Sequence, residues 1–368
     1  GEPADGALSW RFEVAPYRWA SGDRLVGLVS VDPAIVERAD GGIEGRQTYA
    51  SAGGWNAVKN MSFYADGDAA VTLGNFVHVD VDTSGHRGHY RDADRHGSTV
   101  VVDGAKRGNI STGEDNDSVW IRPLSNGSTW GNEFRIATGD GSDTIRIHTA
   151  AHEAAHLFNG RPLVGDGSLT TVRIDAGSGN DILHLGGARE IVDGGAGDRD
   201  TVIYDAATEG VIAFLNEVGV VTPLVGQGGA AGDVLVGVER LKGSRHDDVL
   251  HGNSGDNDLI GGLGDDVLTG GDGHDHFVLA PGYGPGYGMD TVSDFKLGED
   301  TVEVRGVHPA HIHQEVMNIH GTDGLLIRLS HRPEYGVSTM FLEGITTDLA
   351  VDLHAGTEAN WHDGIMLS

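Results

Sequence analysis

Apolar residues recur at every ninth position along one stretch of the chain, with glycine and polar residues between them. Residues 243–278 divide into four consecutive units, GSRHDDVLH, GNSGDNDLI, GGLGDDVLT and GGDGHDHFV. The eighth residue of each unit is apolar, and these residues are Leu250, Leu259, Leu268 and Phe277. Each unit therefore predicts a six-residue turn followed by a three-residue strand whose central side chain points inward. A flexible Gly/Asp linker has no reason to keep this spacing.

Two such units form one coil, so residues 18 positions apart are expected to lie above one another. Three earlier runs, Ala70–Leu73, Val77–Val81 and Thr99–Val102, alternate apolar and other residues and predict further strands of the same stack. The pattern favours an all-β fold, a parallel β-solenoid of the β-helix or β-roll type, from about residue 50 to residue 280. Right-handed coiling is the default for parallel crossovers.

Diverged copies of the turn occur upstream of the regular units. They read TGEDNDSVW from Thr112, TGDGSDTIR from Thr138, AGSGNDILH from Ala176 and GGAGDRDTV from Gly194. The starts of the last two turns, Ala176 and Gly194, are 18 residues apart, which is the length of one minimal coil. The starts of the earlier turns are farther apart in the sequence. Longer steps imply longer coils or inserted loops.

Charge narrows the range of functions. The 368 residues include 55 acidic and 25 basic side chains, which gives a formal net charge of −30. Such a chain repels nucleic acid and anionic membranes. Neither a disulfide framework nor a cysteine-based zinc site exists, because the chain has no cysteine. No run of 18 apolar residues is present, so no membrane-spanning segment is expected.

The sixth position of each unit carries the candidate metal chemistry. Carboxylates stacked at this position repel one another unless a cation lies between them, and Ca²⁺ takes six to eight oxygen ligands from carboxylates and backbone carbonyls. The predicted calcium ligands are the position-six residues Asp248, Asn257, Asp266 and Asp275, with the turn residues Gly243, Arg245, Asp247, Gly262, Gly264 and Gly273. Asn257 lacks a charge, so its site is expected to be weaker.

The upstream turns are predicted to bind Ca²⁺ as well. Their candidate ligands are Asp117, Asp143, Asp181 and, in the last turn, Asp200 or Asp198. The alternative is that these acids only solvate bare turns. The strongly negative charge favours the calcium interpretation, because a row of unneutralised carboxylates would repel itself.

These repeats resemble the RTX (repeats-in-toxin, hemolysin-type calcium-binding repeat) family of type I secreted proteins, most closely over Asp175–Leu353. The segments DVLVGVERLKGS before the regular units and DTVSDFKLGEDTVEV after them fit the same resemblance. It implies that the second segment closes the roll and that Asp290 and Asp294 are further ligands. It also implies export by a type I secretion machinery, an extracellular or cell-surface location, and an export signal in Asp363–Ser368. We do not expect Gly1–Asp5 to begin a cleavable signal peptide, because no basic region followed by an apolar core is present there.

We expect four segments along the chain. Residues 1–50 form an N-terminal cap, 51–242 a diverged β-solenoid with inserted loops, 243–304 the RTX β-roll with its closing segment, and 305–368 a C-terminal β region. The aromatic residues Trp10, Phe12, Tyr17 and Trp19 belong to the cap in this interpretation. The alternative is an exposed aromatic cluster that stacks against sugars.

Two histidine motifs allow other chemistry. The sequence HEAAH at 152–156 matches the H-E-x-x-H zinc signature, provided that Thr149–Phe158 forms a short helix. No third ligand follows at the expected spacing, which favours a packed surface loop. His311 and His313 would share one face of a strand, where they are either an exposed pair or a transition-metal site.

We predict a secreted calcium-binding protein with a structural, adhesive or glycan-binding role and an extracellular polysaccharide as a candidate partner. A polysaccharide lyase or C5-epimerase on a β-helix scaffold is the alternative, since such enzymes need a base, an acid and a group that neutralises a carboxylate. Its loosely placed candidates are Tyr90, Arg87 and His89, or Arg122 and Arg135 along the strand face.

Overall fold

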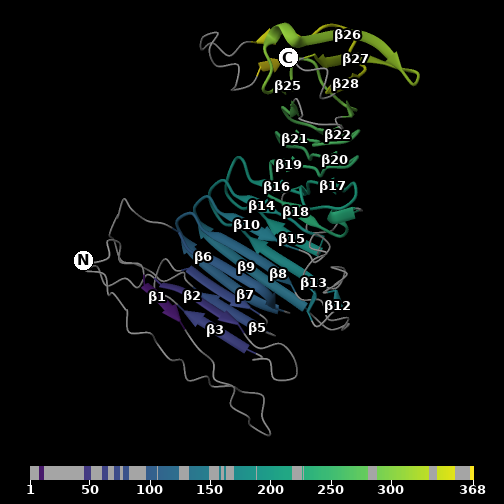
Figure 1. Cartoon of the computed structure of the whole chain (residues 1–368). Coiled ribbons are helices and arrows are strands. Elements are labelled where there is room, and N and C mark those ends of the chain that lie inside the picture. Colours follow the sequence, from purple (N-terminus) through teal and green to yellow (C-terminus); the bar gives the residue numbers. More distant parts are fainter. Residues whose placement is uncertain are drawn as a thin grey trace, which may run out of the picture. The chain divides into compact units, whose positions relative to one another are not determined.

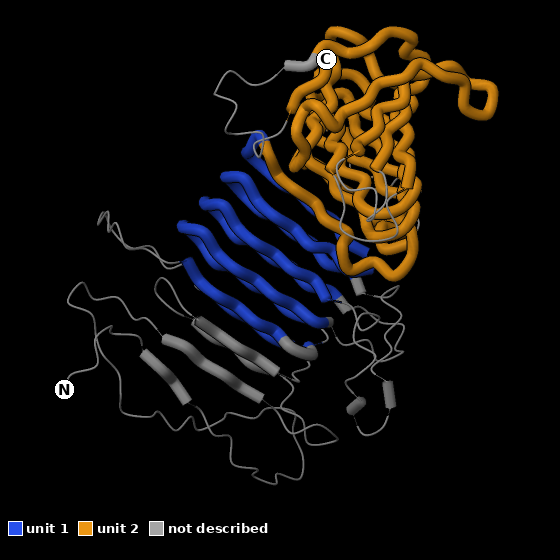
Figure 2. The backbone as a smooth tube through the Cα atoms, turned by 45° about the horizontal axis from the view of Figure 1, so that its top comes forward, with its two compact units in different colours: residues 1–198 blue, residues 199–368 orange. Residues whose placement is uncertain are grey.

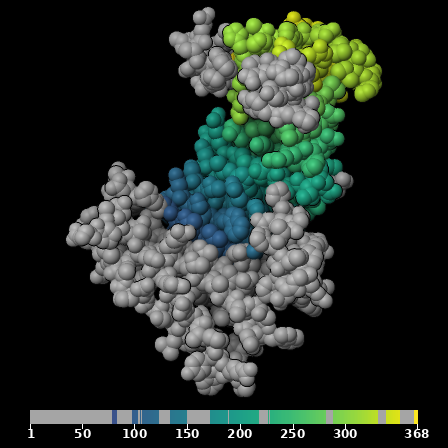
Figure 3. Space-filling view, in the orientation of Figure 1, coloured from purple at the N-terminus to yellow at the C-terminus, as the bar shows by residue number. Residues whose placement is uncertain are grey.

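Short β-branched runs separated by glycine-rich turns fold into strands that stack in parallel, as the computed structural model of the chain shows (Figure 1). The structure describes residues 8–11, 45–50, 60–64, 70–74, 78–82, 97–105, 107–123, 132–148, 157–158, 161–162, 170–187, 189–217, 226, 228–280, 288–330, 338–352 and 365–368. Figures 2 and 3 draw residues outside the described parts in grey. The chain divides into two units, Gly1–Asp198 and Arg199–Ser368 (Figure 2).

The first unit contains two parallel sheets. Sheet 1A has the order β1 (Leu8–Arg11), β2 (Gly45–Ala50), β4 (Ala70–Gly74), β6 (Thr99–Ala105), β8 (Ser118–Pro123), β10 (Thr144–Ile147) and β14 (Ile182–His184). Sheet 1B has the order β3 (Asn60–Tyr64), β5 (His78–Asp82), β7 (Arg107–Glu114), β9 (Asn132–Asp140), β13 (Thr170–Asp175) and β15 (Arg189–Asp193). From β2 onward, successive strands of these two sheets alternate between them, so each coil adds one strand to each sheet.

The second unit repeats this arrangement. Sheet 2A has the order β16 (Thr201–Ile203), β19 (Arg240–Lys242), β21 (Asp258–Ile260), β23 (His276–Leu279), β25 (Thr301–Val304), β30 (Ile365–Leu367) and β29 (Val351–Asp352). Sheet 2B has the order β17 (Ile212–Phe214), β20 (Val249–His251), β22 (Val267–Thr269), β24 (Met289–Val292), β28 (Thr339–Glu343), β27 (Thr322–Leu329) and β26 (Ile312–Ile319). Pairing is parallel from β16 to β25 and from β17 to β28, and it is antiparallel beyond these strands.

A few smaller elements complete the described structure. They are the strands β11 (Leu157–Phe158), β12 (Arg161–Pro162) and β18 (Val234–Val236) and the 3-10 turns η3 (Gly228–Ala230) and η4 (Pro309–His311). No helix within the described residues has the length and apolar character needed to cross a bilayer. The all-β parallel roll predicted from the repeat is therefore confirmed.

The core is the stack of inward apolar side chains. Leu250, Leu259, Leu268 and Phe277, at the eighth positions of the four regular units, are fully buried. Their strands pair at the predicted offset, because Leu250 lies beside Leu268 and Leu259 lies beside Phe277. The strands predicted at Ala70–Leu73, Val77–Val81 and Thr99–Val102 are also present, as β4, β5 and β6.

Glycine is required where successive turns approach most closely. Gly262 has a φ of +126°, and a Cβ atom there would lie 2.3 Å from the carbonyl oxygen of Ser244. Gly177 has a φ of +92°, and its Cβ would lie 1.9 Å from the carbonyl oxygen of Gly139. Backbone atoms cannot move away cheaply at such contacts, so these positions exclude a side chain.

The structure bears on both histidine motifs. The helix that the zinc interpretation of HEAAH requires over Thr149–Phe158 does not extend to Phe158, because Leu157–Phe158 is a strand that pairs antiparallel with Arg161–Pro162. His311 and His313 do not share a strand face, because Pro309 begins a 3-10 turn that contains His311, and the strand starts only at Ile312. The ring nitrogen of His313 instead lies 2.8 Å from the Ser330 hydroxyl.

Candidate calcium sites in the turns

The position-six side chains are buried at the turns, where they form a hydrogen-bonded ladder. The backbone N–H of Asp248 donates to Oδ1 of Asp266 at 2.9 Å, and that of Asn257 donates to Oδ1 of Asp275 at 3.1 Å. Both bonds join residues 18 positions apart. One carboxylate oxygen of each acid therefore holds the preceding coil in register, as the repeat length requires.

The first unit contains the same ladder over longer steps. The N–H of Asp117 donates to Oδ1 of Asp143 across 26 positions, and the N–H of Asp143 donates to Oδ1 of Asp181 across 38 positions. Both distances are 2.7 Å, and all three acids are buried. The longer coils therefore align their turns, as expected from the spacing of the diverged copies.

The second carboxylate oxygen distinguishes the turns. Oδ2 of Asp143, of Asp266 and of Asp275 is buried without a hydrogen-bond partner. An unpaired buried carboxylate oxygen is costly, so it needs a proton or a cation. A Cβ atom on Gly261 would lie 2.1 Å from Oδ2 of Asp266, and one on Gly270 would lie 2.1 Å from Oδ2 of Asp275. The position-one glycines thus leave the space beside these oxygens open.

The second residue of each turn determines whether the position-six carboxylate accepts hydrogen bonds from its own turn. In the first regular unit this residue is Ser244, whose N–H donates to Oδ2 of Asp248 at 2.6 Å and whose hydroxyl donates to Oδ1 at 2.8 Å. Asn253 plays the same part in the second unit, since its N–H donates to Oδ1 of Asn257 at 2.7 Å. Glycine with positive φ stands at this position in the later units, for example Gly262.

The predicted ligands therefore differ in what they offer a cation. Asp266 and Asp275 present a free oxygen, whereas the carboxylate of Asp248 already accepts three hydrogen bonds, the third from the N–H of Val211. The Arg245 side chain is exposed, and so is that of Asp247. The carboxylate of Asp247 accepts the N–H of Asp265 at 2.9 Å, and the predicted glycine ligands have only backbone carbonyls to offer.

The closing segment adds further acids to the ladder. The N–H of Asp266 donates to Oδ1 of Asp290 at 3.4 Å, so Asp290 continues the row of acids. The carboxylate of Asp294 accepts the N–H groups of Gly270 and Gly271, both at 2.9 Å, so it caps the last turn with both oxygens.

Sequence reasoning missed Asp300. Its Oδ1 accepts the N–H of Asp275 at 3.0 Å, and its Oδ2 accepts the N–H of Lys296 at 2.7 Å. The signal was present, because Asp300 precedes the buried Val302 by two positions, like every position-six acid. The last upstream turn shows the same rule: Asp200, two residues before buried Val202, is buried, whereas Asp198 is exposed.

Burial changes the acidity of these carboxyls. It raises the pKa of Asp275 to about 7 and that of Asp181 to about 6, and neighbouring carboxylates add to both effects. Burial raises the pKa of Asp266, and the charge of Asp290 adds to this effect. Burial also raises the pKa of Asp290, although its hydrogen bonds with Asp266 act in the opposite direction. Without a metal, these groups therefore hold protons more tightly than in an unfolded chain, and a divalent cation at the same oxygens relieves the repulsion.

The oxygen-rich turns fit Ca²⁺ better than a metal that prefers nitrogen or sulfur ligands. Within the part of the chain that the structure describes, no group of three or more His, Asp or Glu side chains is close enough to hold an ion. A calcium ion at Asp266 or Asp275 would consequently take most of its ligands from turn carbonyls. The residues of HEAAH, 152–156, lie outside the described residues.

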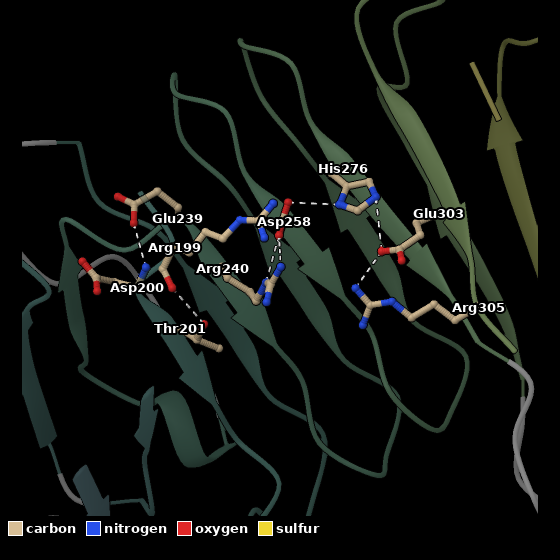
Figure 4. Close-up of polar contacts among 9 residues, drawn as sticks. All are labelled: Arg199, Asp200, Thr201, Glu239, Arg240, Asp258, His276, Glu303 and Arg305. Carbon is tan, nitrogen blue, oxygen red and sulfur yellow. Dashed lines mark hydrogen bonds and ion pairs between the residues drawn. The ribbon is translucent and has the colours of Figure 1, made fainter. Parts of the chain in front are cut away.

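Acids on the outer face of sheet 2A behave differently from those in the turns (Figure 4). Arg240 donates to Asp258 at 2.8 Å, Nδ1 of His276 lies 3.1 Å from the same carboxylate, and Nε2 of His276 lies 3.5 Å from Glu303, which Arg305 contacts at 2.6 Å. Burial alone would raise the pKa of Asp258, but the hydrogen bonds from His276 and Arg240 lower it to about 2. These acids are neutralised by side chains and do not need a metal.

Only two of the residues suggested for a lyase or epimerase lie within the described part of the chain. Tyr90, Arg87 and His89 lie outside the described residues. Arg122 belongs to β8 of sheet 1A, whereas Arg135 belongs to β9 of sheet 1B. The expectation that these two arginines share a strand face was therefore wrong.

Comparison with known proteins identifies the repeat. The RTX calcium-binding nonapeptide repeat matches the chain in four copies, over residues 173–199 and 242–277. These ranges contain the turns of Asp181, Asp248, Asn257, Asp266 and Asp275. A search of curated proteins found no significant match.

Proposed function

Because residues 173–277 carry four RTX calcium-binding nonapeptide repeats, we propose that this chain is a secreted protein whose roll folds when Ca²⁺ binds outside the cell. The observation that supports this proposal best is the unpaired, buried Oδ2 of Asp266 and of Asp275, beside turns that only glycine can form. Without a metal, these unpaired buried oxygens destabilise the fold. A calcium ion that binds them removes this penalty and adds its binding free energy to the stability of the folded state.

The coupling between calcium binding and folding supports secretion as an unfolded chain. Ligands that converge only in the folded state make metal binding part of the folding free energy, so a chain held at low calcium stays unfolded. We propose that a type I secretion machinery exports the unfolded chain and that extracellular calcium then folds it. At the cell surface or in the matrix the folded roll has a structural, adhesive or glycan-binding role.

A calcium titration of the full chain tests the proposal. Extracellular calcium modules bind with Kd values of about 10⁻⁴–10⁻³ M, and we expect this range here because tighter sites would fill before export. Titration calorimetry measures the affinity. A nanomolar Kd, or no binding at millimolar calcium, would contradict folding outside the cell.

Two variants locate the binding within the repeats. Asp266→Ala removes a charged carboxylate with a free oxygen and is expected to weaken calcium binding clearly. Asn257→Ala removes a neutral side chain whose Oδ1 already accepts the N–H of Asn253, so the effect should be smaller. The same titration compares both variants with the unmodified chain, and the reverse order would show that the assigned ligands are wrong.

A further inference from the structure

Sheet 1A presents an aromatic and basic strip on its outer face. The inward residues of β8, β10 and β14 are apolar and fully buried, for example Val119, Ile145 and Leu183. Their neighbours along each strand point outward, because side chains of a strand alternate between its two faces. The outward residues in register are Trp120, Arg146 and His184, and His148 follows β10 on the same face. We call Trp120, Arg146, His148 and His184 the Trp120 strip.

Contacts within the strip form one continuous surface. The rings of Trp120 and His148 are 5.5 Å apart and tilted by 47°. The guanidinium of Arg146 lies 3.1 Å from Nε2 of His184, within hydrogen-bond distance. Trp120, His148 and His184 are half-buried, whereas Arg146 is exposed. The strip thus offers an aromatic platform beside an accessible guanidinium.

The charge of the strip is unusual for this chain. The protein carries a net charge of −30, yet none of the outward residues of β8, β10 and β14 is acidic. They are Ser118, Trp120, Arg122, Thr144, Arg146, Ile182 and His184. By contrast, Arg240 on sheet 2A contacts the carboxylate of Asp258, and Arg173 on sheet 1B contacts that of Glu133 at 2.8 Å.

We propose that the Trp120 strip binds an acidic polysaccharide, a chain of sugars that carry carboxylates. This inference deepens the proposed glycan-binding role and rests on it. The flat face of a sugar ring stacks on an aromatic ring, while the exposed guanidinium of Arg146 forms a bidentate pair with a carboxylate. The hydroxyls of Ser118 and Thr144 lie in the adjacent row and are available to sugar hydroxyls.

The spacing of the strands suits a repeating polymer. Neighbouring strands of a sheet lie about 4.8 Å apart, which is comparable to the length of one monosaccharide unit. Trp120, Arg146 and His184 occupy the same register position on three consecutive strands, so successive sugars along a chain can meet them in turn. Nucleic acid is the less suitable polyanion, because phosphate contacts need a row of Lys and Arg side chains, whereas the strip carries a single arginine.

Binding of short oligosaccharides to the full, calcium-loaded chain tests the inference. Titration calorimetry uses galacturonate oligomers too short to gel with calcium, with a neutral glucose oligomer and single-stranded DNA of equal length for comparison. We expect the acidic sugar to bind at least about tenfold more tightly than either competitor, since charge-assisted contacts supply most of the affinity. Equal or tighter binding of DNA, or no binding of the acidic sugar, would overturn the proposal.

Variants identify the residues. Arg146→Gln and Trp120→Ala are each expected to weaken binding by about tenfold or more. Arg173→Gln is the matched control, because it removes the same charge from sheet 1B and should leave the affinity unchanged. Arg146 is exposed, so its variant should fold, and circular dichroism in the same calcium buffer checks this. Unchanged affinity in a folded Arg146→Gln protein would refute the site, whereas an unmodified chain that does not fold in calcium would contradict the proposed function instead.

Discussion

Removing calcium is expected to unfold the roll. At a calcium concentration about ten times Kd, each ion that binds only the folded state stabilises it by about 1.4 kcal/mol. Several ions together then supply a large part of the about 5–15 kcal/mol that typically separates folded from unfolded protein. Without them, the buried oxygens of Asp266 and Asp275 and the facing carboxyls of Asp266 and Asp290 oppose folding.

Circular dichroism follows this transition. EGTA should abolish the β-sheet signal, and an excess of CaCl₂ should restore it. MgCl₂ at the same concentration is the control, because Mg²⁺ demands a tight octahedral shell and loses its water reluctantly. A chain that keeps its β-sheet signal in EGTA would show that the turns do not depend on calcium.

Acid is expected to replace calcium in part. The pKa of Asp275 in the metal-free fold is about 7 and that of Asp181 about 6, whereas an unfolded aspartate titrates near pH 3.9. Between these values the folded state binds more protons than the unfolded state, so stability falls as pH rises through this range. Metal-free protein should therefore gain β-sheet signal when the pH is lowered from about 8 to about 5.5.

The calcium-loaded chain provides the internal control. Protons and calcium compete for the same oxygens, so calcium affinity should fall over the same pH interval in which the metal-free fold becomes more stable. Protein freed of metal by dialysis is measured at each pH by circular dichroism, because EGTA itself weakens in acid. A metal-free chain that gained structure as pH rose would contradict the assigned protonation.

The repeat predicted the architecture because the spacing of apolar residues is itself the geometry of the coil. Leu250 and Leu268 had to meet once the nine-residue period was recognised. The separations of 26 and 38 residues between the upstream turns could also be taken from the sequence, and they align Asp117, Asp143 and Asp181. The same separations place Arg146 between Trp120 and His184 on neighbouring strands. The division of the chain into cap, solenoid, roll and C-terminal region stays a prediction.

The availability of each carboxylate could not be predicted from residue type. Asp248 and Asp266 occupy equivalent positions, yet the N–H and hydroxyl of Ser244 saturate Asp248, while Gly262, with a φ of +126°, leaves Oδ2 of Asp266 free. That difference depends on backbone conformation at the second turn position. The prediction that His311 and His313 share a strand face was wrong for a similar reason. Side chains alternate between faces only within a strand, and His311 belongs to the 3-10 turn that begins at Pro309.

The position of the bound ions tests the central claim most directly. Crystals grown in CaCl₂ should show anomalous difference peaks at about 2.3–2.6 Å from Oδ2 of Asp266 and of Asp275, the normal range for calcium–oxygen bonds. Peaks are also expected beside Asp143 and Asp181, since the upstream turns repeat the same ladder. Water beside Asp143 and Asp181 alone would confine calcium binding to residues 243–278. Water or protonated carboxyls at all four acids would contradict the assignment of these turns as calcium sites.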